Sequence, residues 1–487
     1  MSNIFEIIKK ALKNKVLYYI FSRYATFFIQ FINSLFIAVF LGPYYLGIWG
    51  FIRLVIEYLN QINLGISHSV NAIISIHNNK EWYIKKIIGT SITMLISLSL
   101  FIILFFIANK LLNLNIGSKY NFSTYAPAVA AIGILAYFNS LFSNIFRVYG
   151  KVTEIAINQS AFPVLMLITI LIFRGENLLW ALVGANFIAF LLSFILYLYK
   201  TPVNLRPQFI CRLAKTIQTK GWHLFVYNTS FYLIIISTKS FISGYYSVEE
   251  FGYFTFAYSL ANVVLLLLQS FSFLIFPKLI NRMANAANEK VLELLVIVRD
   301  LYVTSSHLLA HVAILLIPVF ILYFPQYQKA ENVFKLTALT VVLYSNAFGY
   351  SSLLIAKRNE KKLGYFALMA LAFNIISIWV LAELFNVNFE FVILGTMLAN
   401  FIYIFLLTYT GRKKMDLKTD TFIILKDTYP IRLFIPFFLS LFLIILTTNG
   451  FFFLIPIVLF IILNNKELVK IGQVLKRIIS NPLIINI

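Results

Sequence analysis

The chain has little of what water-soluble enzymes depend on. Only 12% of its 487 residues are charged, 18 residues are acidic, and Cys211 is the single cysteine. One cysteine excludes an internal disulfide and a multi-cysteine metal site. The sequence also lacks a phosphate-binding loop, an HExxH motif and a nucleophile-and-base constellation. We therefore expect no ATP-driven pump and no enzyme of these classes, and we predict neither a cofactor nor a metal.

Hydrophobic side chains make up 61% of the chain, which is more apolar surface than a soluble core could bury. Lipid must therefore be the main solvent. The net charge of +22 would suggest nucleic acid as a partner of a soluble protein. Here the basic residues fall between apolar spans, a pattern typical of membrane orientation, so we reject nucleic-acid binding.

Long apolar runs predict an all-α integral membrane protein with fourteen spans, or twelve. A span needs about 20 apolar residues. On that length the spans lie near 16–40, 46–65, 88–108, 124–146, 152–173, 177–199, 222–242, 251–276, 301–324, 332–356, 363–385, 389–410, 431–448 and 450–464.

Lysine and arginine crowd alternate connections, and 32 of the 40 lie on one side. This bias places that side, with both termini, in the cytoplasm of a bacterial inner membrane protein. The longest outer connection is 109–123, so we expect no soluble domain outside. After the last span, apolar and basic residues alternate at helical spacing over 466–478, which predicts an amphipathic helix lying on anionic headgroups.

An internal repeat is visible at an offset of 205 residues. LGPYYLGIWG, beginning at Leu41, has a weak echo in the segment beginning at Tyr245, and Gly47 aligns with Gly252. Spans one to six then fall on spans seven to twelve in the same orientation. We predict two parallel six-helix lobes around a central cavity, a transporter architecture, with two further spans. We expect the first lobe over 1–200, the second lobe over 201–414, and the two further spans with the amphipathic C-terminal helix over 415–487.

LGPYYLGIWG, SVEEFGYF and FPQYQKAENVF are similar to the turns of a known family. The chain resembles, over about residues 10–465, the polysaccharide flippases of the multidrug/oligosaccharidyl-lipid/polysaccharide exporter superfamily, which include O-antigen flippases. The resemblance implies a two-lobed helical fold and an undecaprenyl-pyrophosphate-linked oligosaccharide as substrate. It also implies that Arg23 and Arg53 line a cationic cavity, as arginines of the first two helices do in related flippases. Their counterparts in the repeat, Asn228 and Tyr258, are not cationic.

The residues themselves also single out these two arginines, because charges inside a span are costly and usually face a polar route. A guanidinium can hold a diphosphate. Glu57, one turn after Arg53, is also a candidate for the substrate site. For Arg53 the structural alternative is an intrahelical pair with this Glu57. For Arg23 the alternative is a side chain that extends back to the inner headgroups.

Other polar residues inside spans are weaker candidates. Asn33 and Asn60 could hydrogen-bond sugar hydroxyls, although such residues more often join helices together. Lys239 lies near an outer span end and could bind substrate or extend to the surface. His307 and His311, spaced i and i+4, could serve ion coupling or simply pack.

The sequence therefore predicts a flippase that moves a lipid-linked O-antigen or capsule unit from the cytoplasmic to the periplasmic leaflet. Its expected partners are the lipid-linked glycan, membrane lipids, and a polysaccharide polymerase with its chain-length machinery. Two alternatives stay open. One is a cation-coupled multidrug exporter of the same superfamily, and the other is an integral-membrane polysaccharide polymerase or ligase.

Overall fold

A computed structural model describes residues 15–76, 80–203, 205–447 and 449–480. Throughout these ranges the chain forms helices and turns and no β-strand. The chain divides into two compact units, each described here by itself. The first comprises residues 1–229 with Ser247–Gly252, and the second comprises Ser230–Tyr246 with residues 253–487. The predicted all-helical fold is confirmed.

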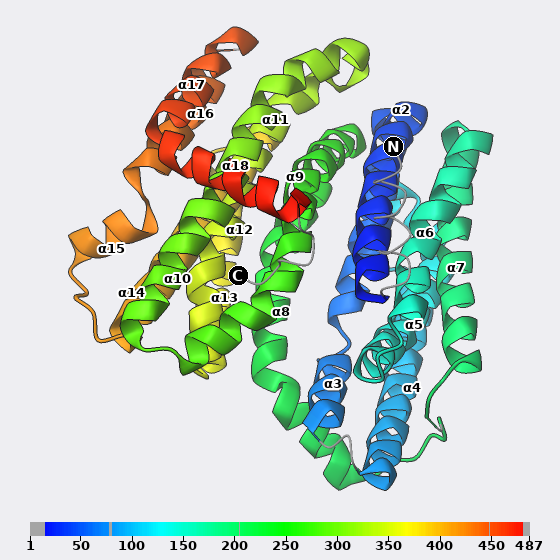
Figure 1. Ribbon diagram of the computed structural model, residues 1–487. Helices are drawn as coiled ribbons and strands as arrows, with labels where there is room; N and C mark the ends of the chain where they lie inside the picture. The colour runs from blue at the N-terminus through cyan, green and yellow to red at the C-terminus, as the bar shows by residue number, and fades with distance from the viewer. Residues whose placement is uncertain (1–14, 77–79, 204, 448, 481–487) are drawn as a thin grey trace. The chain divides into compact units, whose positions relative to one another are not determined.

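The first unit is a bundle of long helices (Figure 1). Its elements are α2 (Lys15–Gln61), α3 (Ile66–Ile76), α4 (Glu81–Leu111), η1 (Ser118–Tyr120), α5 (Phe122–Val148), α6 (Val152–Ile172), α7 (Gly175–Tyr199) and the first part of α8 (Cys211–Tyr245). Two-thirds of the most apolar stretch of α5 is buried, against 28% for α4 and for α6. Helix α5 is therefore the core of this unit, while α4 and α6 keep the apolar surface that lipid requires.

Helix α2 is really two helices that meet at Gly42. Gly42 has a φ of 70°, a left-handed conformation that side chains disfavour, and Pro43 begins the second helix. This break lies at the turn predicted between the first two spans. Arg23 and Arg53 consequently belong to different helices, one on each side of Gly42.

The second unit continues the chain from α8 through to the C-terminal helix. Its elements are α9 (Val248–Asn285), α10 (Asn288–Val298), η2 (Arg299–Val303), α11 (Thr304–Tyr323), η3 (Pro325–Ala330), α12 (Glu331–Ala356), α13 (Glu360–Trp379), η4 (Val380–Leu384), η5 (Phe389–Phe391), α14 (Ile393–Lys414), α15 (Thr421–Thr428), α16 (Ile431–Leu446), η6 (Gly450–Phe453), α17 (Leu454–Leu463) and α18 (Asn465–Ser480). Helices α12 and α14 are its core, with 78% and 61% of their apolar stretches buried.

Nine helices in the described part of the chain are long and apolar enough to cross a membrane, or eleven if each of two bent pairs is one span. One of the nine, Ser22–Gln61, contains both predicted spans on either side of Gly42. Helices α8 and α9 lie where the seventh and eighth spans were expected, and some of their side chains are outside the described set. The protein is a multi-pass membrane protein, and the total of fourteen spans stays a prediction.

Helix α18 confirms the expected helix after the last span. It turns by 76° from the direction of η6 and α17, and Figure 1 shows it running across neighbouring helices of its unit. Lys466 and Lys470 are exposed, whereas Leu468 and Ile471 are partly covered. This division of apolar and basic faces suits a helix at a membrane surface.

Candidate functional site

Arg23 is half-buried in the first helix of α2 and contacts α6. Its Nη1 donates a hydrogen bond of 3.0 Å to Oε1 of Gln159. Its guanidinium carbon also lies 4.5 Å from the ring centroid of Phe27, one turn further into the span. A cation over an aromatic face is attracted by the ring's electrons, so Phe27 helps to hold this side chain.

Arg53 is half-buried in the second helix of α2 and faces the same neighbour. Its guanidinium carbon lies 5.7 Å from the ring centroid of Phe162 in α6. Among the described residues no ion pair joins Arg53 to Glu57, although both side chains are described and Glu57 is one turn away. The intrahelical pair that the spacing allowed is therefore not formed, and the positive charge of Arg53 is not neutralised by Glu57.

The two arginines reach a single turn of α6. Gln159 and Phe162 are three residues apart, which is about 4.5 Å along a helix axis. Pro163, next to Phe162, accepts a hydrogen bond of 2.7 Å through its carbonyl from Nδ2 of buried Asn33. Helix α6 thus gathers three of the predicted site residues, although Asn33 itself acts as a link between helices.

The pairing with α6 also shows which way Arg23 extends. Arg23 and Asn33 are ten residues apart on α2, about 15 Å, whereas their partners Gln159 and Pro163 are four apart on α6, about 6 Å. The side chains must therefore span the difference between these two distances along the helix axes. Arg23 therefore reaches toward the level of Asn33, as its contact with Phe27 also indicates, and it does not extend back along α2 to the inner headgroups.

Neither Asn60 nor Glu57 makes a described contact with the two arginines. Asn60 lies in the last turn of α2, where its carbonyl accepts a 2.9 Å hydrogen bond from the side chain of Asn63. The Tyr137 hydroxyl donates to the neighbouring carbonyl of Leu59 at 2.6 Å. These bonds complete the end of the helix, and a substrate-binding role for Asn60 and Glu57 stays a prediction.

Lys239 lies in the second unit and meets the repeat counterpart of Arg53. Its Nζ is 4.4 Å from the ring centroid of Tyr258. Tyr258 occupies the position 205 residues after Arg53, where the sequence predicted no cation. A positive charge is present there after all, and it comes from α8.

His307 and His311 are buried in the second unit. Nε2 of His307 lies 3.1 Å from Oδ1 of Asn346, and Nδ1 of His311 lies 3.2 Å from Oγ of Ser440. The rings also pack against phenylalanines, with a centroid distance of 5.4 Å between His311 and Phe460. Three or more metal-ligating side chains do not gather anywhere in the described part of the chain. The two histidines are thus packed between helices, and a coupling role stays a prediction.

A network of charges, which the sequence did not predict, joins helices α16 and α18 to η2 within the second unit. Buried Asp300 accepts from Nη2 of Arg432 at 2.5 Å and lies 3.6 Å from Nζ of Lys470. Arg432 also pairs with Glu467 at 2.7 Å. Because Glu467 and Lys470 belong to α18, these ion pairs fix the amphipathic helix to η2 and to the start of α16.

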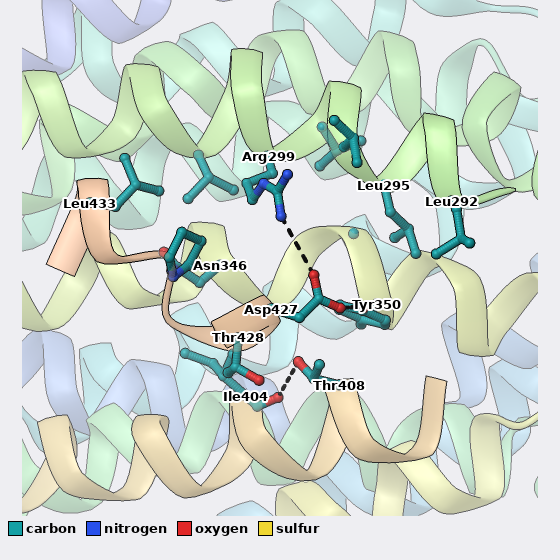
Figure 2. Close-up of a pocket in the computed structure, with 15 residues that line it drawn as sticks. Leu292, Leu295, Arg299, Asn346, Tyr350, Ile404, Thr408, Asp427, Thr428 and Leu433 are labelled. Carbon is teal, nitrogen blue, oxygen red and sulfur yellow. Dashed lines mark hydrogen bonds and ion pairs between the residues drawn. The ribbon is translucent and has the colours of Figure 1, made fainter. Parts of the chain in front are cut away.

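A pocket lies beside this network. Figure 2 shows Arg299 pointing toward Asp427, at 3.5 Å, with Tyr350 hydrogen-bonded to the same carboxylate. The pocket holds about 560 Å³ of empty space, part of it open to solvent. Its walls are mostly apolar, including Leu295 and Leu433, and its charges are already paired. None of the predicted site residues lines it.

Comparison with known proteins agrees with the fold. The family described as "Polysaccharide biosynthesis protein" matches residues 12–283. No curated protein matches the chain in sequence. Among solved structures, "Lipid II flippase MurJ, inward closed conformation" has a TM-score of 0.68 at 13% identity, covering 94% of this chain and 99% of MurJ.

Two multidrug transporters are also similar in structure. An inward-facing MATE transporter of the MOP superfamily has a TM-score of 0.62 at 15% identity, covering 80% of this chain and 94% of its own. The MATE transporter DinF-BH has a TM-score of 0.56 at 16% identity, and the match covers 84% of this chain and 97% of DinF-BH. At such identities the likeness establishes the fold alone. The family match spans more than half of the sequence, so the chain belongs to the polysaccharide biosynthesis protein family, on the helical fold that MurJ and the MATE transporters share.

Proposed function

We propose that this protein is a flippase that carries an undecaprenyl-pyrophosphate-linked oligosaccharide, an O-antigen or capsule repeat unit, from the cytoplasmic to the periplasmic leaflet. Membership of the polysaccharide biosynthesis family supports this class of substrate. The structural likeness to a protein named as a lipid II flippase is consistent with it. The assignment to the inner membrane, with both termini in the cytoplasm, rests on the distribution of basic residues.

The observation that carries the proposal is the meeting of Arg23 and Arg53 at one turn of α6. A lipid-linked diphosphate must cross about 30 Å of hydrocarbon, where a charged headgroup is poorly solvated. Two guanidinium groups at nearly the same depth can each donate two hydrogen bonds to phosphate oxygens. Gln159 and the rings of Phe27 and Phe162, which are uncharged groups, contact them there.

In this mechanism the arginines bind the pyrophosphate from the cytoplasmic side while the lipid tail stays in the bilayer. Reorientation of the helices then exposes the glycan outside, where a polymerase and its chain-length machinery use it. Since the chain has no phosphate-binding loop, the energy must come from an ion gradient or from consumption of the unit outside.

Deletion of the protein tests the substrate. We expect complete undecaprenyl-linked repeat units to accumulate facing the cytoplasm, detected by their resistance to a glycan-cleaving enzyme added outside intact spheroplasts. Restoring the protein should move the units outward. Complete units that face the periplasm in the deletion strain would contradict the proposal and indicate a polymerase or ligase.

The second candidate is a cation-coupled multidrug exporter. The MATE multidrug transporters have a fold similar to that of this chain. Such an exporter would favour buried carboxylates, and this chain has few of them within its spans. A deletion strain with normal surface polysaccharide and raised sensitivity to cationic dyes would support the exporter and contradict the flippase.

A further inference from the structure

The pocket of the second unit combines apolar walls with a charged mouth. It lies between α10, η2, α12, α14, α15 and α16, all of which belong to that unit. In Figure 2, Leu292 and Leu295 lie on one side of Arg299, and Leu433 lies on the other. The walls thus offer contacts to an apolar chain, and the mouth offers a cation.

The cation at the mouth, Arg299, is shared between two carboxylates and held closely by neither. Its Nη1 lies 3.5 Å from Oδ1 of Asp427, and its Nε lies 3.7 Å from Oδ1 of Asp300. Asp427 has a nearer partner in Arg412, at 3.0 Å, and Asp300 has one in Arg432, at 2.5 Å. Charge-assisted hydrogen bonds are usually about 2.7–2.9 Å long. The Arg299 side chain is 30% exposed, and its Nε donates no hydrogen bond among the described residues, so it retains donors for a further acceptor.

The charges around the mouth do not balance. The connected ion pairs in the described part of the chain join four cations, Arg299, Arg412, Arg432 and Lys470, to three carboxylates, Asp300, Asp427 and Glu467. The excess lies with Arg299 and Lys470, whose ion pairs are all 3.5 Å or longer. One bound anion would therefore neutralise the network.

The mouth lies where lipid headgroups are expected. Arg299, Arg412 and Arg432 belong to connections that the distribution of basic residues assigns to the cytoplasm. Helix α18, predicted to lie on headgroups, joins the same network through Glu467. Anionic lipids make the cytoplasmic leaflet negative, and basic pockets between membrane helices bind such headgroups. A free anion would leave the apolar walls unused, so charge, depth and walls together favour an anionic lipid.

We propose that this pocket binds one anionic phospholipid of the cytoplasmic leaflet. The phosphate lies against Arg299 and supplies the negative charge that the network lacks. The part of one acyl chain nearest the headgroup packs against Leu292, Leu295 and Leu433, while the rest of the lipid stays in the bilayer. The bound lipid thereby braces α10 against α16. The site contains neither Arg23 nor Arg53, and the inference does not depend on the proposed function.

Lipid binding by the purified full chain in a neutral detergent tests the site. We expect saturable binding of radiolabelled dioleoyl phosphatidylglycerol. Phosphatidylcholine with the same chains should displace it at least about tenfold less well, because a charge-assisted contact is lost. Equal displacement by phosphatidylcholine or by inorganic phosphate would overturn the proposal. Stronger displacement by undecaprenyl pyrophosphate would also overturn it, because the pocket would then belong to a polyprenyl lipid.

Two variants separate the mouth from the walls. Arg299→Gln should weaken phosphatidylglycerol binding by about tenfold, and Arg282→Gln, at an exposed arginine of the same unit, is its control. Leu292→Trp fills the apolar wall and leaves every charge in place, so it should weaken binding as well. Leu294→Trp, on the same helix but outside the pocket lining, is the matched control. Undiminished affinity in Arg299→Gln or in Leu292→Trp would overturn the proposal.

A phosphatidylglycerol with a photoreactive group near the carbonyl end of one acyl chain needs no variant, so the result does not depend on how a variant folds. After irradiation of the parent protein we expect cross-links in α10 or α16 that excess unlabelled phosphatidylglycerol removes. Cross-links confined to other helices would overturn the site. The measurement uses no glycan, so failed cross-linking beside normal glycan flipping would reject the lipid site and leave the proposed function standing.

Discussion

The ion pair between Lys335 and Glu331 at the start of α12 predicts that the free energy of unfolding falls by different amounts when one or the other residue is replaced. Lys335 is completely buried, its Nζ lies 2.6 Å from Oε1 of Glu331, and it sits 4.3 Å from the ring centroid of Phe453. The side chain of Glu331 is 21% exposed. Removing the carboxylate would leave an ammonium group buried without its counter-charge, whereas removing the ammonium would leave a carboxylate that water can still reach.

The structure sets the size of each effect. Glu331→Gln should destabilise the protein by about 3 kcal/mol, the lower end for a broken buried pair, because the glutamine oxygen can still accept a hydrogen bond. Lys335→Met should cost about 1 kcal/mol, since methionine fills the same space and keeps a favourable contact with Phe453. The double variant should cost less than Glu331→Gln alone, because no unpaired charge remains.

The assay is equilibrium unfolding in mixed detergent micelles, followed by tryptophan fluorescence, for the two single variants and the double. Lys329→Met, at an exposed lysine nearby, is the control and should change the free energy of unfolding very little. The reasoning fails if Lys335→Met costs as much as Glu331→Gln, or if the two single effects simply add.

Three further outcomes are expected from other contacts. Asp300→Asn should weaken the hold of Arg432 on α18, at a cost of about 2 kcal/mol, and limited proteolysis should then cut α18 sooner than in the parent. Gln159→Leu removes the acceptor of Arg23 and should slow glycan flipping by about tenfold at equal protein abundance; an unchanged rate would separate this contact from transport. Replacing both His307 and His311 by Gln should lower the melting temperature and leave the pH profile of transport unchanged. An altered pH profile would assign the two histidines to ion coupling.

Local signals in the sequence predicted those features that depend on neighbouring residues. Apolar runs located the helices, and the Gly42–Pro43 pair located the break in α2, because glycine and proline act through their own backbone preferences. The offset of 205 aligned Gly47 with Gly252, and in the structure a Cβ added at Gly252 would lie 3.1 Å from the nitrogen of Gly47. The divisions at 200 and 414 stay predictions.

Contacts between distant helices could not be read in the same way. Gln159 and Phe162 lie more than a hundred residues from Arg23 and Arg53, and nothing in their local sequence distinguishes them from other residues of an apolar span. Lys335 falls at the start of the predicted span 332–356, and nothing in its local sequence indicates the contact with the distant Phe453 that helps to bury it. Asp300 likewise acquires its role from residues 132 and 170 positions later. A hydropathy pattern specifies which face of a helix is apolar, but it does not name the partner.

Transport by purified protein tests the central claim most directly. Proteoliposomes that carry a fluorescent undecaprenyl-pyrophosphate glycan would be made with the parent, with Arg53→Ala, with Arg23→Ala and with the exposed control Arg147→Ala. Loss of a charge-assisted contact to phosphate should slow flipping by at least about tenfold in each of the first two variants, with the control unchanged. Flipping at the parent rate by Arg53→Ala and Arg23→Ala would contradict the proposal that these arginines carry the pyrophosphate across the membrane.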